Sequence, residues 1–169
     1  MSDRVKVGVV GVGYLGRFHA LIYSHMPDVK LVGVVDTDSK RAHEVAGEAG
    51  CRVFHHYDEL VDQVDAVSVV VPTTLHLEVA RPFLQRGIHT LLEKPIAHNQ
   101  QEGETIIGLA EQGGAVLQIG HLERFNAGVM ALAQRIDSPR FIEAHRMGGF
   151  VERATDVDVV SDLMIHDID

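Results

Sequence analysis

Short apolar runs alternate with amphipathic stretches over the first 120 residues of the chain. The apolar runs have the length and the β-branched content of buried strands, and they cover residues 4–10, 30–35, 51–54, 66–71, 89–92 and 116–119. The fourth run is almost continuously apolar, which suits a strand covered on both faces of a sheet. Strands that alternate with helices predict an α/β fold with a parallel sheet.

The stretches between the strands predict helices. The apolar side chains of Tyr14, Phe18, Leu21 and Ile22 fall on one helical face, and further helices are expected at residues 38–49, 57–64, 75–87 and 99–112. Asn99, with Glu102 three residues later, resembles a capping box at the start of the last of these. Six strands with intervening helices match a doubly wound Rossmann sheet in the order 3-2-1-4-5-6.

The pattern changes after Gly120. A helix is expected over residues 123–136, a long strand over 141–150, and a helix in the second half of 158–169. We therefore predict a dinucleotide-binding domain at residues 1–121, followed at residues 122–169 by the beginning of an α+β domain for substrate and oligomerisation.

Composition and charge narrow the possible partners. The formal net charge is -9, and the basic residues are scattered, so neither nucleic acid nor an anionic membrane is an expected partner. Cys51 is the only cysteine, which excludes a disulfide framework or a Cys-rich zinc site within one chain. With no apolar stretch of membrane-spanning length and no visible signal peptide, we expect a cytoplasmic protein.

A glycine-rich loop follows the first strand and opens the first helix. In Gly11-x-Gly13-x-x-Gly16, the first glycine permits a tight turn, the second lets the backbone approach a pyrophosphate, and the third lets helix and strand pack closely. Tyr14 and Leu15 lie between them and are expected to contact the cofactor as well. Free N–H groups at the helix N-terminus supply the positive field that the net charge lacks.

Asp36 strengthens this interpretation. It ends the second strand, where a carboxylate accepts hydrogen bonds from the adenosine ribose hydroxyls and repels a 2′-phosphate, so NAD is favoured over NADP. Lys40 and Arg41, one helical turn later, keep NADP as the less favoured alternative. Another alternative is that Asp36 only caps the next helix.

Candidate catalytic residues follow the fifth strand and lie near the end of the chain. Glu93 and Lys94 end that strand, so they face the crevice beyond the carboxyl edge, where an ammonium can stabilise a substrate oxygen. Asp162 and His166 are four residues apart and share a helical face, and His is the natural general base near neutral pH. For Lys94, the alternative is an ordinary surface lysine. For Asp162 and His166, the alternatives are an i,i+4 surface ion pair or, together with Asp169, a metal site. A metal is not expected, because nothing else in the sequence indicates one.

Two further groups are candidates for ligand binding. Pro72, Thr73 and His76 follow the fourth strand and can border the nicotinamide ribose, although Thr73 can equally cap a helix and His76 can be structural. Arg124 and Asn126 follow the sixth strand, where they can bind a phosphate or sugar hydroxyl or form a structural ion pair. The remaining histidines have no matching partners, and we expect them on the surface or in loops.

Together these elements resemble the Gfo/Idh/MocA family of nicotinamide-dependent oxidoreductases. The residues that carry the resemblance run through the whole chain in the family's order: Gly11, Gly13, Gly16, Asp36, residues 71–73 with His76, residues 93–95, and Asp162 with His166. The resemblance implies a two-domain, homo-oligomeric enzyme (dimer or tetramer) whose Rossmann domain holds NAD. It also implies that His166 removes a proton from a sugar hydroxyl while Lys94 stabilises the oxygen, with Asp162 in the same catalytic group.

The segments at residues 120–126 and 162–169 resemble one bacterial subgroup of the family, which implies a UDP-sugar substrate such as UDP-N-acetylglucosamine. Two other functions stay open: a glycosidase that uses NAD for transient oxidation, and a non-catalytic NAD-sensing module. Family members are much longer than 169 residues, so we expect the second domain and the substrate site to be incomplete in this chain.

Overall fold

The computed structural model describes residues 4–145 and 160–169, of which residues 161 and 162 are described by their backbone alone. Its centre is a six-stranded sheet in the order β3-β2-β1-β4-β5-β6, with every neighbouring pair parallel. The strands are β1 (Val5–Val10), β2 (Val29–Val35), β3 (Arg52–Phe54), β4 (Ala66–Val69), β5 (His89–Leu92) and β6 (Leu117–Ile119). The predicted strand order and fold class are confirmed.

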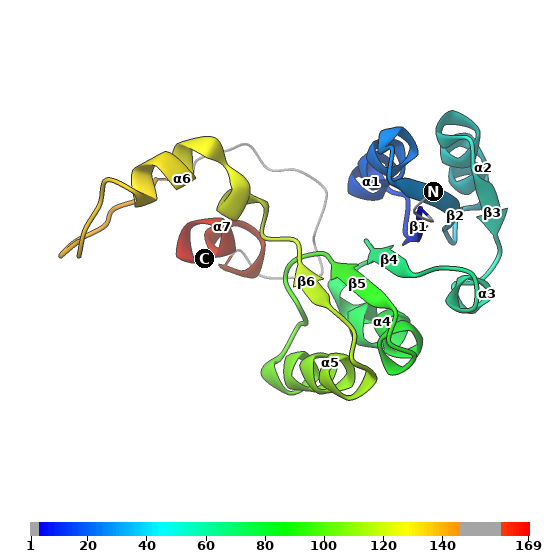
Figure 1. The fold of residues 1–169 in the computed structure, drawn as a ribbon. Coiled ribbons are helices and arrows are strands. Elements are labelled where there is room, and N and C mark those ends of the chain that lie inside the picture. The colour runs from blue at the N-terminus through cyan, green and yellow to red at the C-terminus, as the bar shows by residue number, and fades with distance from the viewer. Residues whose placement is uncertain (1–3, 146–159) are drawn as a thin grey trace.

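Helices cover both faces of this sheet (Figure 1). On one face lie α1 (Tyr14–His25) and α2 (Ser39–Ala49); on the other lie α3 (Asp58–Val61), α4 (His76–Gln85) and α5 (Gln100–Gly113). The sheet has a buried apolar cluster on each face, because successive side chains of a strand point to opposite faces. Ala20 and Val45 pack on Val9 in one cluster, and Phe83 and Ile106 are among the residues of the other.

Short-range signals set the ends of the helices. The Asp38 side chain accepts a hydrogen bond from the Arg41 backbone N–H, and that of Asn99 accepts one from the Glu102 N–H. α2 and α5 each end at a glycine in the left-handed conformation, Gly50 and Gly114, with φ of 67° and 69°. The cap predicted at Asn99 is therefore present, while Oε2 of Glu102 lies 3.0 Å from Nδ1 of His98.

The apolar face predicted for the first helix points away from the sheet. Tyr14, Phe18 and Ile22 are all exposed, while Gly16 and Ala20 are the buried residues of α1. Small side chains face the strands because the glycine loop brings α1 close to them. The periodicity predicted the helix correctly, but it did not predict which face is buried.

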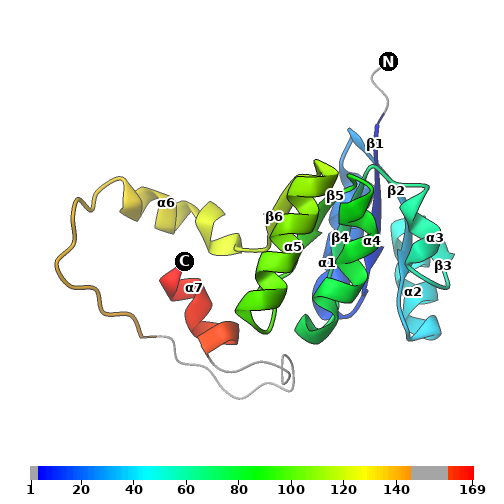
Figure 2. The same ribbon diagram turned by 90° about the horizontal axis from the view of Figure 1, so that it is seen from below.

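The region after β6 differs from its prediction. The single helix expected at residues 123–136 is a 3-10 turn η2 (Leu122–Phe125) and a separate helix α6 (Ala127–Ala133). They divide at Asn126, whose extended backbone leaves the helical region and whose side chain accepts from the Gly128 N–H to cap α6. α6 and the residues that follow it extend away from the sheet (Figure 2).

A long strand is expected at residues 141–150, and the structure describes the first five of these residues. Residues 141–145 form no strand, since no other strand in the described ranges lies beside them to supply hydrogen-bond partners; residues 146–150 lie outside the described part. The helical ending is confirmed, as a π-helical turn η3 (Val160–Met164) leading into α7 (Ile165–Ile168). Within the described residues, no helix is long and apolar enough to cross a membrane.

Candidate cofactor and active site

Most of the candidate residues lie at one edge of the sheet. The loop with Gly11 follows β1, Asp36 follows β2, Pro72 follows β4, and Glu93 follows β5. Because all the strands are parallel, their carboxyl ends share this edge. The chain order reverses between β1 and β4, which are neighbours at the centre. Ligands of open α/β sheets bind at such a switch point.

The three glycines of the loop meet different surroundings. Gly11 has φ of 84°, and a Cβ added there would lie 2.3 Å from the carbonyl oxygen of Val70. A Cβ on Gly16 would lie 1.9 Å from the carbonyl oxygen of Gly11. A Cβ on Gly13 would meet no atom within 4 Å. The first and third glycines therefore allow close packing, whereas the second leaves its backbone open, as a pyrophosphate requires.

The start of α1 faces this opening. Gly13 is the N-cap of the helix, and no side chain caps the first N–H groups. Such N–H groups attract an anion because they lack partners and carry the positive end of the helix dipole. Tyr14 is exposed and Leu15 is half-buried beside them. The loop thus fits a dinucleotide, and the predicted contacts of Tyr14 and Leu15 with it stay predictions.

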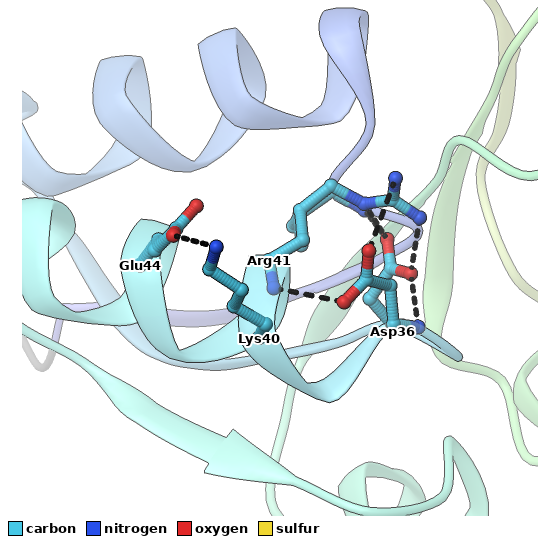
Figure 3. A network of polar contacts seen from close by, with 6 residues as sticks. Asp36, Lys40, Arg41 and Glu44 are labelled. Atoms are coloured by element: carbon cyan, nitrogen blue, oxygen red, sulfur yellow. Dashed lines mark hydrogen bonds and ion pairs between the residues drawn. The ribbon is translucent and has the colours of Figure 1, made fainter.

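Asp36 is joined to the glycine loop and to Arg41, whose guanidinium lies against its carboxylate (Figure 3). Its Oδ2 accepts a hydrogen bond of 2.8 Å from the Val12 N–H, and its Oδ1 accepts one of 2.8 Å from the Asp38 N–H. The Arg41 guanidinium donates to both oxygens, at 3.1 Å and 2.7 Å. Asp38, not Asp36, caps α2. The carboxylate therefore belongs to the cofactor edge and is not the helix cap.

These contacts govern the charge of Asp36. Burial alone would raise the pKa of this carboxyl, but the hydrogen bonds from Arg41 and from the two backbone N–H groups outweigh burial and hold the pKa below its usual value. The Asp36 carboxylate in turn raises the pKa of Arg41, although partial burial opposes this. Both groups are accordingly charged at neutral pH.

Glu93 is buried at the end of β5 and held on two sides. Its Oε1 lies 3.3 Å from Nε2 of His19 on α1, and both of its oxygens lie 2.9 Å from where a Cβ of Gly120 would be. The Lys94 N–H donates to Oε2 at 3.3 Å. The first residues after β5 are therefore fixed by contacts with α1 and with the end of β6.

This arrangement includes residues that sequence reasoning missed. The sequence predicts His19 on the surface or in a loop, yet its Nδ1 lies 3.2 Å from Oγ of Ser68 on β4. That Oγ lies 2.7 Å from the Tyr23 hydroxyl. A polar chain thus runs from α1 through β4 toward Glu93. The signal was spacing: His19 and Tyr23 are four residues apart on the side of α1 that carries Gly16 and Ala20.

The residues after β4 form a second link between strand ends. Thr73 begins a 3-10 turn, η1 (Thr73–Leu75), after Pro72, and it is buried. His76 is buried too, with its ring nitrogens 3.1 Å from the carbonyl oxygen of Val71 and 3.3 Å from that of Ile96. Burial lowers the pKa of His76, although those carbonyls oppose the shift. His76 holds the loops after β4 and β5 together, and its predicted contact with the cofactor stays a prediction.

The candidates after β6 have partners of their own. Arg124 donates from Nε to Oδ2 of Asp169 at 2.7 Å, and Asp169 also lies 3.4 Å from Nδ1 of His121. The structural ion pair considered as an alternative for Arg124 is thus present. Asn126 donates to Glu123 at 2.9 Å as well as capping α6. Binding of a phosphate or sugar by Arg124 and Asn126 stays a prediction.

Asp162 and His166 lie on successive turns, in η3 and α7. His166 is half-buried. The side chain of Asp162 lies outside the described part, so the expected shared face, like the metal alternative, stays a prediction. Among the described residues, no group of three or more His, Cys, Asp or Glu side chains is placed to hold a metal ion.

Comparison with known proteins places this site in context. Residues 5–121 match the sequence profile of the Gfo/Idh/MocA oxidoreductase family, described as having an NAD-binding Rossmann fold. A UDP-N-acetylglucosamine 3-dehydrogenase from Acidithiobacillus ferrooxidans is 45% identical over 166 residues, covering 98% of this chain and 52% of its own. The inositol 2-dehydrogenase of Rubrobacter xylanophilus is 31% identical, covering 99% and 51%.

Solved structures agree with these matches. The structure of the Acidithiobacillus ferrooxidans enzyme superposes with a TM-score of 0.90 at 44% identity, covering 98% of this chain and 54% of that one. A scyllo-inositol dehydrogenase from Lactobacillus casei with bound NAD(H) and scyllo-inositol gives a TM-score of 0.72 at 28% identity, covering 78% and 40%. This chain spans about half the length of the curated relatives that it matches.

Proposed function

Because this chain belongs to the Gfo/Idh/MocA family of NAD-binding oxidoreductases, we propose that it is the cofactor-binding part of a dehydrogenase that oxidises a ring hydroxyl of a UDP-sugar. The proposed substrate is UDP-N-acetylglucosamine and the product a keto sugar. The 45% identity to an enzyme named for that substrate supports this choice. The predicted cofactor, NAD, is the one that the family description names.

The open backbone at Gly13, beside the uncapped start of α1 and next to Asp36, is the observation that carries the proposal. It lies on the same edge as Lys94, whose backbone is held by the buried Glu93. A dinucleotide on this edge would have its pyrophosphate at residues 11–16 and its adenosine ribose near Asp36. Pro72, Thr73, Glu93 and Lys94 are then available to its nicotinamide half.

Three side chains are proposed for the chemistry. Bound NAD supplies the hydride acceptor. His166 takes the proton from the substrate hydroxyl, and the Lys94 ammonium donates a hydrogen bond to that oxygen as negative charge develops on it. Asp162 orients His166 or binds the substrate, and Arg124 with Asn126 contributes to the sugar site.

We also propose the organisation of the protein. Residues 1–121 form the cofactor domain and residues 122–169 begin the substrate domain, which is supported by the family match at residues 5–121. The whole protein is proposed to be a cytoplasmic homo-oligomer; its acidic charge and single cysteine support that location. Size-exclusion chromatography with light scattering tests the oligomer, and a monomer would contradict it.

The decisive experiment follows absorbance at 340 nm with the full-length protein, NAD and UDP-N-acetylglucosamine. We expect NADH to form, and we expect Lys94→Ala and His166→Ala to reduce kcat by at least about a hundredfold, as loss of a general base or of an oxyanion donor does. Arg86→Ala is the matched control, since Arg86 pairs with Asp62 on the exposed surface.

The same assay separates the other functions considered. No NADH with any UDP-sugar would contradict the proposed substrate. Sugar release without net NADH would indicate the glycosidase. NAD binding with no effect of Lys94→Ala on any activity would indicate an NAD-sensing module. The relatives described above are named as dehydrogenases, and they support neither alternative.

A further inference from the structure

The carboxylate of Asp36 has no acceptor position to spare. An ionised carboxylate has about four lone-pair positions. In this structure Val12 N–H and Arg41 Nε–H occupy two of them on Oδ2, and Asp38 N–H and Arg41 Nη2–H occupy two on Oδ1. The Asp36 side chain is only 5% exposed, whereas that of Arg41, which covers it, is 44% exposed. A ribose hydroxyl can therefore bond to Asp36 only after Arg41 gives up at least one of its contacts.

Arg41 is the contact that can be given up. The other two donors are backbone N–H groups of the glycine loop and of the turn before α2, and these groups are fixed by the fold. Arg41 has a long side chain in the first turn of α2, and that side chain is partly exposed. Turning the guanidinium outward breaks its ion pair with the Asp36 carboxylate, but Arg41 belongs to neither apolar cluster, so the core packing is kept.

The charge at this position also differs from that of an isolated aspartate. An unpaired carboxylate repels a 2′-phosphate, which is the usual reason for a preference for NAD. In this chain Arg41 pairs with that carboxylate through both oxygens. Lys40 lies beside it on α2, largely exposed, with its Nζ 3.8 Å from Oε1 of Glu44 (Figure 3). The guanidinium, whose Nη1 also lies 3.8 Å from Oδ2 of Asp38, offsets the repulsion by Asp36 and can bind phosphate through two hydrogen bonds.

We propose that Arg41 lets the adenosine end of the site accept either cofactor: it gives up contacts with Asp36 when a dinucleotide binds and holds the 2′-phosphate where there is one, so that the protein binds NADP as well as NAD. This inference rests on the proposed cofactor site. With NAD, Asp36 accepts the ribose hydroxyls and Arg41 turns to solvent. With NADP, the guanidinium lies between the carboxylate and the 2′-phosphate and bonds to the phosphate.

The test is calorimetric titration of the full-length protein with NAD and with NADP. For the wild type, we expect the Kd for NADP to lie within about tenfold of that for NAD, because Arg41 offsets the repulsion by Asp36. For Arg41→Ala, we expect NADP to bind at least about tenfold more weakly, while the Kd for NAD stays within about threefold or decreases. Arg41→Gln, which keeps most of the side-chain volume, should give the same result.

Arg86→Ala is the control. Arg86 makes an ion pair of the same length with Asp62, 2.7 Å, at the other end of the strands, and its removal should change neither Kd. NAD binding without NADP binding in the wild type would overturn the inference alone. Equal weakening of both cofactors by Arg41→Ala would also overturn it. If neither dinucleotide bound, the proposed cofactor site itself would be wrong.

Discussion

The chain up to Gly120 (the first half) and the chain after it (the second half) both contain large apolar side chains, but many of these are buried in the first half, whereas none of the described ones is buried in the second. Up to Gly120, apolar side chains from strands and helices are buried in two clusters, one on each face of the sheet. Among the described residues after Gly120, none is buried. Phe83 is 0% exposed, while Phe125 is 69% exposed. The first half supplies neighbours for its own apolar surface, whereas the described part of the second half does not.

The comparison shows that the stability of a segment and the placement of its functional residues depend on contacts with other strands and helices. The glycine loop, Asp36 and Glu93 are all held by contacts from other strands or helices of the first half. Among the described side chains, only that of Asp169 accepts a hydrogen bond from the Arg124 side chain. Substitutions of matched residues in the two halves should therefore differ in size, and the following four predictions run from the largest effect to the smallest.

The largest effect is expected from paired phenylalanine substitutions. Phe83→Ala should reduce the free energy of unfolding by about 3–5 kcal/mol, because it leaves a cavity in the larger cluster. Phe125→Ala should change it by less than about 0.5 kcal/mol, because that ring is exposed. Urea denaturation followed by circular dichroism measures both. Equal losses would show that the second half is packed in solution as tightly as the first.

The next effect concerns the glycine loop. Gly16→Ala should destabilise the protein by about 1–3 kcal/mol, since its Cβ would collide with the Gly11 carbonyl, and it should weaken NAD binding by displacing the loop. Gly47→Ala is the matched control: it also lies within a helix, and its Cβ would meet nothing within 4 Å. The control should gain up to about 1 kcal/mol. Unchanged NAD affinity in Gly16→Ala would contradict the assignment of the loop.

The next prediction concerns the reactivity of the Cys51 thiol in the first half and the pH dependence of the free energy of unfolding. Burial raises the pKa of this thiol to about 11. Its thiolate is therefore scarcer in the folded than in the unfolded chain, so alkylation at pH 8 should be roughly a hundredfold slower in the native protein. The unfolded thiol loses its proton first as pH rises, so the free energy of unfolding should fall between the ordinary thiol pKa and pH 11. Cys51→Ala should flatten that decline; an unchanged decline would mean that other groups cause it.

The smallest effect is expected at the Arg124–Asp169 pair. Arg124→Ala should leave the midpoint of thermal unfolding unchanged, because the Arg124 side chain is largely exposed and surface pairs contribute little. Hydrogen bonding from Arg124, with the nearby His121, lowers the pKa of Asp169. Loss of Arg124 should raise that pKa toward its usual value, as carbon-detected NMR titration can measure. A clear loss of thermal stability would show that this pair, which joins η2 to the end of α7, contributes more than an ordinary surface ion pair.

Much of the first half could be predicted because its signals are local. Val-rich runs, helix caps at Asp38 and Asn99, and the Gly11-x-Gly13-x-x-Gly16 spacing each depend on a few consecutive residues. The order of the strands followed from their number and alternation. The same local rules failed near Asn126, where a helical pattern hid a residue that ends one helical turn and caps the next.

The amino-acid sequence by itself determined the six alternating strands, the place of the glycine loop and the presence of a carboxylate at the end of β2. Only the tertiary structure decided which groups meet that carboxylate, which face of α1 is buried and that His19 reaches Glu93. The physical reason is range: periodicity and capping act between near neighbours along the chain, whereas these contacts join segments that the parallel sheet brings to one edge. The predicted ribose ligand, Asp36, thus proved to be held by Arg41, a residue that the sequence alone could mark only as a nearby charge.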